Sequence, residues 1–172
     1  MALARFRRKE EMMKKKIAIL ASAVLVLVVV ALPAAAGDAA VRCRGQSLYV
    51  PVYSHIYSGD KERPFYLAVT LSIRNTDSRY AIHLSRVDYY DTDGNLLRHY
   101  LEKPVTLAPL ASVRHVIAEG DKAGGSGANF IVAWHADQPV VAPVVESVMI
   151  GTYTQQGISF TSRAQVVETD GE

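Results

Sequence analysis

The sequence predicts an all-β protein, an antiparallel β-sandwich of immunoglobulin-like type that follows an N-terminal apolar signal helix. From Gln46 onward, apolar residues recur at every second position, as in half-buried strands, and not at the helical spacing of 3.6 residues. Proline- and glycine-containing turns separate about seven or eight such runs. A small closed β-barrel has the same periodicity, so it stays open as the alternative.

The N-terminal segment has the order of residues that an export signal requires. A basic stretch ends at Lys16, and residues 17–32 form an apolar run with Ser22 as its only polar member. Ala34 and Ala36 then form an A-x-A cleavage site before Gly37. We predict a signal peptide or membrane anchor over residues 1–36, because the run is shorter than the roughly 20 residues of a spanning helix.

This segment predicts an exported protein, periplasmic or extracellular, with anchoring to the inner membrane as the alternative. We expect the chain to contact the membrane only through this N-terminal segment. A lipid anchor is not expected, because Arg42 precedes Cys43 and disrupts a lipoprotein signal. Cys43 is the single cysteine, so it is free or pairs between chains, and the fold depends on its core.

Removing the signal changes the charge balance. Seven of the nineteen Lys and Arg residues and two of the seventeen Asp and Glu residues lie in residues 1–36, which leaves twelve basic and fifteen acidic residues, a formal charge of −3. This balance argues against nucleic-acid binding. We divide the remainder into a leader (37–45), a β-sandwich domain (46–165) and a disordered tail (166–172), because one domain of this length buries a sufficient core.

Turn and strand signals make local predictions. Residues 67–73 alternate most regularly, and Asp93-Gly94 predicts a type I′ hairpin after the strand over residues 82–91. Pro51 lies in an alternating run and predicts a sheet edge, because proline cannot donate to a ladder. Trp134 shares the spacing of neighbouring core residues, so we interpret it as a core anchor.

Several longer stretches resemble one bacterial family. They are YVPVYSHIY, LSIRNTD, DYYDTDG, YLEKPVTLAPLAS, GGSGANFIVAW, ESVMIGT and QGISFTSR, and they span residues 49–163. The chain resembles the family called domain of unknown function 3124. The resemblance implies a small exported or lipid-anchored domain, and it carries over no catalytic or binding residue.

The sequence offers one weak set of metal ligands. His55, Asp60 and either Asp88 or Asp91 would converge at one end of the sandwich, but none stands in a ligand-spaced pair. Surface histidines and turn-capping aspartates explain the same residues without an ion. The sequence predicts no cofactor and no catalytic residue. Without a Gly-x-Ser-x-Gly elbow we do not predict an enzyme, although a triad of distant residues stays open.

Tyrosines are the other candidates for function. Tyr49, Tyr53, Tyr57 and Tyr66 could present a surface that binds an envelope protein or a glycan. Tyrosines on strands also simply cover a sheet. The sequence therefore predicts an exported, non-enzymatic binding or structural module of the cell envelope, with a small metal- or ligand-binding periplasmic domain as the alternative.

Overall fold

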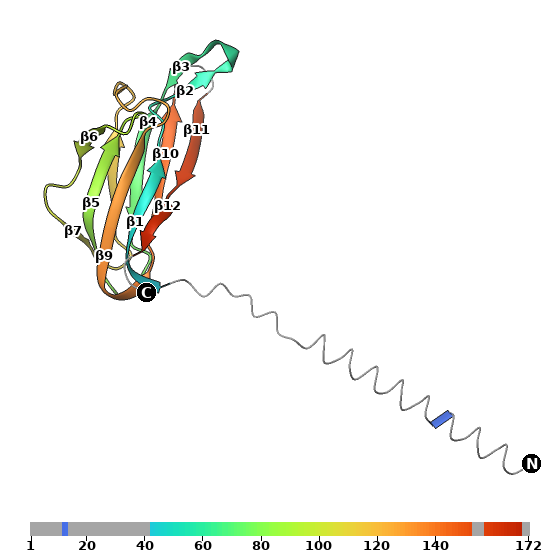
Figure 1. Cartoon of the computed structure of the whole chain (residues 1–172), viewed down its shortest axis with the longest axis vertical. Coiled ribbons are helices and arrows are strands. Elements are labelled where there is room, and N and C mark those ends of the chain that lie inside the picture. Colours follow the sequence, from blue (N-terminus) through green and yellow to red (C-terminus); the bar gives the residue numbers. More distant parts are fainter. Residues whose placement is uncertain (1–11, 14–41, 153–156, 170–172) are drawn as a thin grey trace, which may run out of the picture. The chain divides into compact units, whose positions relative to one another are not determined.

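The computed structural model describes residues 12–13, 42–152 and 157–169. The chain divides into two units, residues 1–39 and 40–172, and all the strands lie in the second (Figure 1). Apart from Met12 and Met13, the predicted signal segment lies outside the described residues. Within the described part of the chain, no helix has the length and apolar character needed to cross a membrane.

The larger sheet has six strands, all paired antiparallel, in the order β12-β1-β9-β5-β6, and β7 also pairs with β5. Its long central strand β9 contacts β1 on one side and β5 on the other. The strands are β1 (Arg42–Pro51), β5 (Ile82–Tyr90), β6 (Leu96–His99), β7 (Val105–Leu107), β9 (Asn129–Val141) and β12 (Gln165–Thr169).

The smaller sheet has four antiparallel strands in the order β11-β10-β4-β8. A separate hairpin of β2 and β3, with a 3₁₀ turn η1 between them, lies at one end of the sheets (Figure 1). The elements are β2 (His55–Ser58), η1 (Gly59–Lys61), β3 (Arg63–Tyr66), β4 (Ala68–Arg74), β8 (Ser112–Ile117), β10 (Val144–Gly151) and β11 (Ile158–Arg163).

One hydrophobic core joins the two sheets. Trp134 and Phe130 from the larger sheet belong to the same buried cluster as Leu71 and Met149 from the smaller one. Trp134 is 1% exposed, which confirms its interpretation as a core anchor. The prediction of an all-β, antiparallel fold is confirmed. The barrel alternative is wrong, because in the described chain each sheet ends in strands that are paired on one side only.

The position predicted from Pro51 is wrong. β1 is an inner strand that pairs with both β9 and β12, so it does not lie at a sheet edge. The physical rule behind the prediction still holds, because Pro51 is the last residue of β1 and lies beyond Tyr49, the last residue facing β12. Its carbonyl oxygen accepts a hydrogen bond from Ser147 Oγ at 2.7 Å, which joins the two sheets.

The hairpin predicted at Asp93-Gly94 is confirmed as β5–β6, but its turn type is wrong. A type I′ turn needs positive φ at both central residues, and here Gly94 (φ 82°) has it whereas Asp93 does not. The Asp91 carbonyl accepts from the Gly94 N–H, and the Asn95 carbonyl from the Asp91 N–H. The loop is a type I turn followed by a left-handed glycine.

The sheets extend beyond the predicted domain boundaries of 46 and 165. β1 begins at Arg42, inside the predicted leader, and β12 ends at Thr169, inside the predicted disordered tail. The tail looks polar, yet residues 166–169 belong to a strand because β1 supplies their backbone partners, as in the pair Leu48 and Val166. Residues 37–41 and 170–172 lie outside the described residues.

A buried asparagine organises the turn after β4. Asn75 is 2% exposed, and its side-chain Nδ2 contacts the carbonyl oxygens of Tyr80, Leu107 and Ala108 at 2.8, 3.2 and 3.0 Å. Its Oδ1 accepts from the backbone N–H of Asp77 at 3.0 Å. One side chain thus satisfies backbone groups from two separate loops. Without it, these buried groups would have neither water nor another hydrogen-bond partner.

Asp77 completes this arrangement, which we call the polar knot (Asn75 and Asp77). Its Oδ1 accepts from the N–H groups of Arg79 and Tyr80, and its Oδ2 accepts from the Val141 N–H at 3.1 Å and from Arg42 Nη1 at 3.2 Å. The N–H groups of Arg79 and Val141 hold the pKa of Asp77 below its ordinary value, against the effect of burial. The knot therefore connects β1, the β4–β5 turn and the end of β9.

We expect Asn75→Ala to lower the free energy of unfolding by about 2–4 kcal/mol, because it strips hydrogen bonds from several buried backbone groups. Urea denaturation followed by tryptophan fluorescence measures this, since Trp134 is the only tryptophan. Ser78→Ala is the matched control, an exposed residue of the same turn, and should change stability by less than about 0.5 kcal/mol. Equal stability of the two variants would contradict the role of the knot.

Candidate binding face

The candidate site is the outer face of the smaller sheet, and strand alternation produces it. Val69, Leu71 and Ile73 of β4 point into the core and are 0% exposed. The residues between them must point the opposite way, because successive side chains alternate across a strand. The outward residues of β4 are Ala68, Thr70, Ser72 and Arg74.

The register of the sheet gathers arginines on this face. Ser72 of β4 lies opposite Arg114 of β8 on one side and Glu146 of β10 on the other. Glu146 in turn lies opposite Arg163 of β11. Arg74 stands two residues along β4, on the same side as Ser72. We call Arg74, Arg114 and Arg163 the arginine face.

Few contacts restrain these guanidinium groups. Arg74 Nε donates to Ser72 Oγ at 3.0 Å, and its Nη2 lies 3.9 Å from Glu146 Oε1. In the described chain, the side chains of Arg114 and Arg163 have no hydrogen bond or ion pair. An exposed pair at 3.9 Å contributes little, so the face keeps most of its positive charge available.

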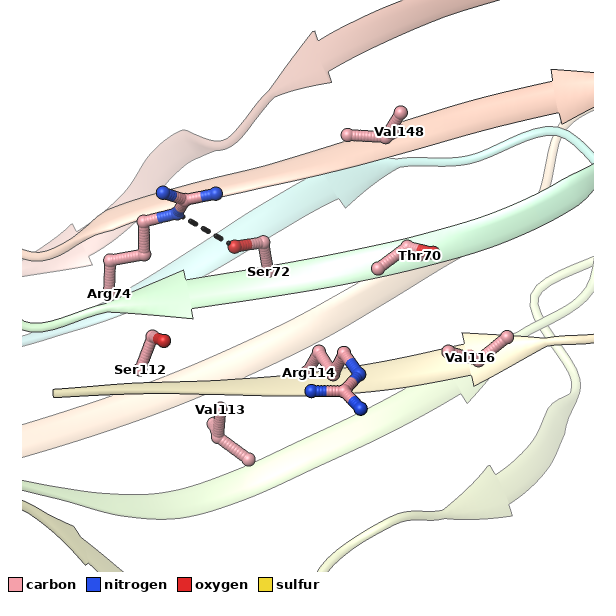
Figure 2. A pocket seen from close by; sticks show the side chains of 8 residues that line it. All are labelled: Thr70, Ser72, Arg74, Ser112, Val113, Arg114, Val116 and Val148. Atoms are coloured by element: carbon pink, nitrogen blue, oxygen red, sulfur yellow. Dashed lines mark hydrogen bonds between the residues drawn. The ribbon is translucent and has the colours of Figure 1, made fainter.

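A shallow groove of about 490 Å³ crosses the face (Figure 2). In Figure 2, Arg74 and Arg114 come from neighbouring strands, and Val148 comes from the strand beyond Arg74. The groove thus combines guanidinium groups, hydroxyl groups and apolar side chains, which together suit a carboxylate or phosphate attached to a partly apolar molecule. The lining residues are Thr70, Ser72, Arg74, Ser112, Val113, Arg114, Val116 and Val148.

Among the described residues, the structure does not gather the metal ligands suggested by the sequence into one group. His55 begins β2, and Asp60 lies exposed in η1. Asp91 caps the β5–β6 turn, where its carboxylate accepts from the N–H groups of Asp93 and Asn95 at 2.9 and 2.8 Å. Considering only the residues that the structure describes, no three His, Cys, Asp or Glu side chains form a group that could hold a metal ion.

Asp88 has its own partners on the outer side of the larger sheet. Its Oδ1 lies 2.7 Å from His99 Nδ1, and its Oδ2 accepts from Arg86 Nε at 2.5 Å. Burial raises the pKa of Asp88, but the hydrogen bonds from His99 and Arg86 and the charge of Arg86 outweigh it, so this pKa lies below its ordinary value. Asp88 is a structural acceptor for these two side chains.

The sheet also pairs two histidines that sequence spacing does not connect. His83 of β5 lies opposite His135 of β9, with ring centroids 5.1 Å apart. His83 Nδ1 contacts Thr106 Oγ1 at 2.9 Å, and its Nε2 lies 3.9 Å from an exposed Asp137 carboxylate. This pair was missed because only the register of β5 against β9 brings it together.

Two of the four candidate tyrosines meet at the β2–β3 hairpin. Tyr57 is 52% exposed and packs edge-to-face on His55, which packs in the same way on Tyr66, with centroids 5.2 and 6.0 Å apart. The Lys122 ammonium lies 4.3 Å above the Tyr66 ring. These rings meet edge to face, so they do not form one flat surface.

The other two candidate tyrosines lie elsewhere. Tyr53 packs edge-to-face on Phe160 at 5.7 Å and against the core. Tyr49 lies within β1, opposite Gln165 of β12 and Ile131 of β9. Tyr49, Tyr53, Tyr57 and Tyr66 are therefore distributed between a sheet surface, the core boundary and the hairpin.

Sequence reasoning missed the arginine face. Alternation over residues 67–74 does place Arg74 opposite the core residues, and that signal was available. The neighbours of Arg74 were not, because Arg114 and Glu146 join it only through the pairing of β4 with β8 and β10.

Comparison with known proteins identifies the family. The model of the family described as "Protein of unknown function (DUF3124)" matches residues 45–167. The chain belongs to this family. The match covers the strands of both sheets almost completely, from the fourth residue of β1 into β12, and it confirms the resemblance found in the sequence.

A solved structure and the curated proteins add little to the family assignment. A structure titled "Crystal Structure of Thermotoga maritima 1070" matches with a TM-score of 0.43 and 13% identity, covering 73% of this chain and 97% of that chain. No curated protein matches the chain.

We expect Asp88→Asn to reduce stability at pH 7 by about 1–2 kcal/mol, after allowance for solvent screening, because it weakens the bonds from His99 and Arg86. Ionised Asp88 stabilises the fold above the unfolded Asp pKa of about 3.9, and this contribution is lost as pH falls through its lower folded pKa. The variant should thus lose less stability than the wild type on acidification.

Urea denaturation at a series of pH values from about 7 to 2 measures both effects. Asp60→Asn is the control, because Asp60 is exposed in η1, and it should leave the stability curve unchanged. Parallel pH curves for Asp88→Asn and the wild type would refute the assignment.

Proposed function

We propose that this family member is an exported, non-enzymatic binding module of the cell envelope that recognises an acidic partner through its arginine face. The observation that carries the proposal is that Arg74, Arg114 and Arg163 share one sheet face with Glu146. Guanidinium groups bind carboxylate and phosphate oxygens with two parallel hydrogen bonds. The partner therefore carries such groups.

The charge of the whole domain makes this face distinctive. Residues 37–172 carry twelve basic and fifteen acidic side chains, so a basic face requires local separation of charge. Opposite potentials speed association and select partners. The hydroxyls of Ser72 and Ser112 add neutral donors beside the arginines, and Val148 adds apolar contact. These groups suit the binding of an acidic partner.

The export part of the proposal is supported by the N-terminal sequence alone. Basic residues, the apolar run over 17–32 and the A-x-A site before Gly37 direct the domain to the periplasm or the cell exterior, with a retained inner-membrane anchor as the alternative. The partner is accordingly an envelope protein or an acidic glycan. The alternative function, a metal- or ligand-binding site at His55 and Asp60, gains no support from their positions.

The proposal also extends to the type of fold. We propose that the two sheets and their shared core form a sandwich whose two packed layers resemble those of an immunoglobulin domain. The strand order is its own, because the last two strands, β11 and β12, lie in different sheets, whereas the last two strands of an immunoglobulin domain lie side by side.

We expect the double variant Arg74→Gln/Arg114→Gln to bind immobilised poly-glutamate at least about tenfold more weakly, because each charged hydrogen bond contributes about 1.5 kcal/mol or more. Biolayer interferometry at low and physiological salt measures this, and wild-type binding should weaken with salt.

The matched control is the double variant Arg44→Gln/Arg79→Gln, which has the same charge change at two other exposed arginines. It should retain most of the binding. Equal loss in both double variants would show general charge attraction and would overturn the assignment to the arginine face.

We expect the protein recovered from cell envelopes to begin at Gly37, since the A-x-A site precedes it. Intact-mass spectrometry of the periplasmic and washed membrane fractions measures this. A membrane-bound chain that keeps residues 1–36 would support the retained anchor. An uncleaved chain in the cytosol would refute export.

A further inference from the structure

The edge of the smaller sheet beside the arginine face has a free backbone. β8 pairs with β4 through an uninterrupted register from Ser112 to Ile117, with no bulge. In the described part of the chain, no strand pairs with its other edge, and no backbone hydrogen bond of a turn or loop reaches it. β8 has no bulge or proline that would block pairing with another strand, and the charge of Arg114 opposes pairing with a basic strand.

Exposed apolar residues lie on β8 and just before it. Val116 of β8 is 53% exposed, and Leu110, just before the strand, is 70% exposed. Leu110 has a φ of 60°, a left-handed conformation that disfavours a leucine side chain. Its N–H donates to the Asp77 carbonyl, and the Ala111 N–H donates to the Ala108 carbonyl, so the turn is held in this form. The fold thus displays an apolar side chain in a strained conformation.

We propose that β8 receives an extended acidic segment of a partner polypeptide as an added strand of the smaller sheet. The inference rests on the proposed function and names its partner class. Backbone hydrogen bonds to β8 would supply affinity, and alternate side chains would supply specificity. The charge of the edge selects the occupant. A second copy of this chain would place its own arginines against Arg114, whereas an acidic strand would neutralise the charge of Arg114.

The register defines what the added strand must contain. Its outward residue opposite Arg114 is acidic, and the neighbour two positions away, opposite Val116, is apolar or a hydroxyl residue. Its inward residues lie opposite Val113 and His115, both half-buried, and are apolar. His115 packs edge-to-face on Tyr100, with ring centroids 4.9 Å apart, and burial lowers the pKa of His115. The neutral imidazole thus continues an apolar environment toward the free edge.

The test uses the domain without its signal, residues 37–172, which contain all the described strands. The probe is a fluorescein-labelled eight-residue peptide in which valine alternates with glutamate and threonine. In one comparison peptide, the backbone amides that face β8, which are every second amide, are N-methylated. In another, glutamine replaces glutamate. Fluorescence anisotropy measures affinity, and hydrogen exchange measures protection of the β8 amides.

We expect the acidic peptide to bind, the N-methylated and glutamine peptides to bind at least about tenfold more weakly, and the β8 amides to gain protection. Leu110→Gly should weaken binding by about tenfold while the domain stays folded, because glycine adopts positive φ without strain. The control is Val166→Ala on β12, because Val166 is an exposed apolar residue away from β8. This variant should retain binding.

Other results overturn the inference in distinguishable ways. Equal binding of the N-methylated peptide, with loss on Arg114→Gln, would exclude strand addition and leave the proposed function intact. A dimer in native mass spectrometry with protected β8 amides would make the occupant a second copy. No binding of either the acidic peptide or poly-glutamate would refute the inference and the proposed function together.

Discussion

The polar knot of Asn75 and Asp77 is the constraint on which the arrangement of this protein depends. Two side chains, each 2% exposed, satisfy backbone groups of the β4–β5 turn, the loop before β8 and the end of β9, and Asp77 also holds Arg42 at the start of β1. Apolar alternation excludes a slip of one residue but tolerates a slip of two, whereas buried hydrogen bonds lose their partners in both cases. The knot therefore fixes both sheets relative to each other at one end of the core.

The candidate site follows from this arrangement. The Asp77 carbonyl accepts a hydrogen bond from the Leu110 N–H, so the exposed Leu110 is bonded directly to the polar knot. The next residues form β8, and its pairing with β4 places Arg114 level with Ser72 and near Arg74. A basic groove and an open strand edge thus share one strand. A partner that used the edge would also meet the groove, because the two surfaces are continuous through Arg114 and Val116.

Local sequence signals predicted much of the fold and little of the site. Alternation identified the core residues of β4, and the Asp-Gly pair identified the β5–β6 hairpin, because both signals act over a few residues. The edge position predicted from Pro51 was wrong because the effect of a proline depends on its position within the strand. The strand β12 was not predicted because its residues look polar and its partner strand is more than one hundred residues away. The tyrosines looked equivalent in sequence, yet Tyr53 contacts the core while Tyr57 is exposed.

By itself, the sequence determined the strand class, the core side of each clear strand, the family resemblance and the expected export route, since these depend on composition, periodicity and short motifs. Only the tertiary structure decided which strands are neighbours, which strand is an edge, and which charged side chains share a face. Those properties depend on pairing between segments distant in the chain, where a shift of one residue moves every side chain to the opposite face. The three arginines of the candidate site were therefore visible as residues in the sequence, but their common face was not.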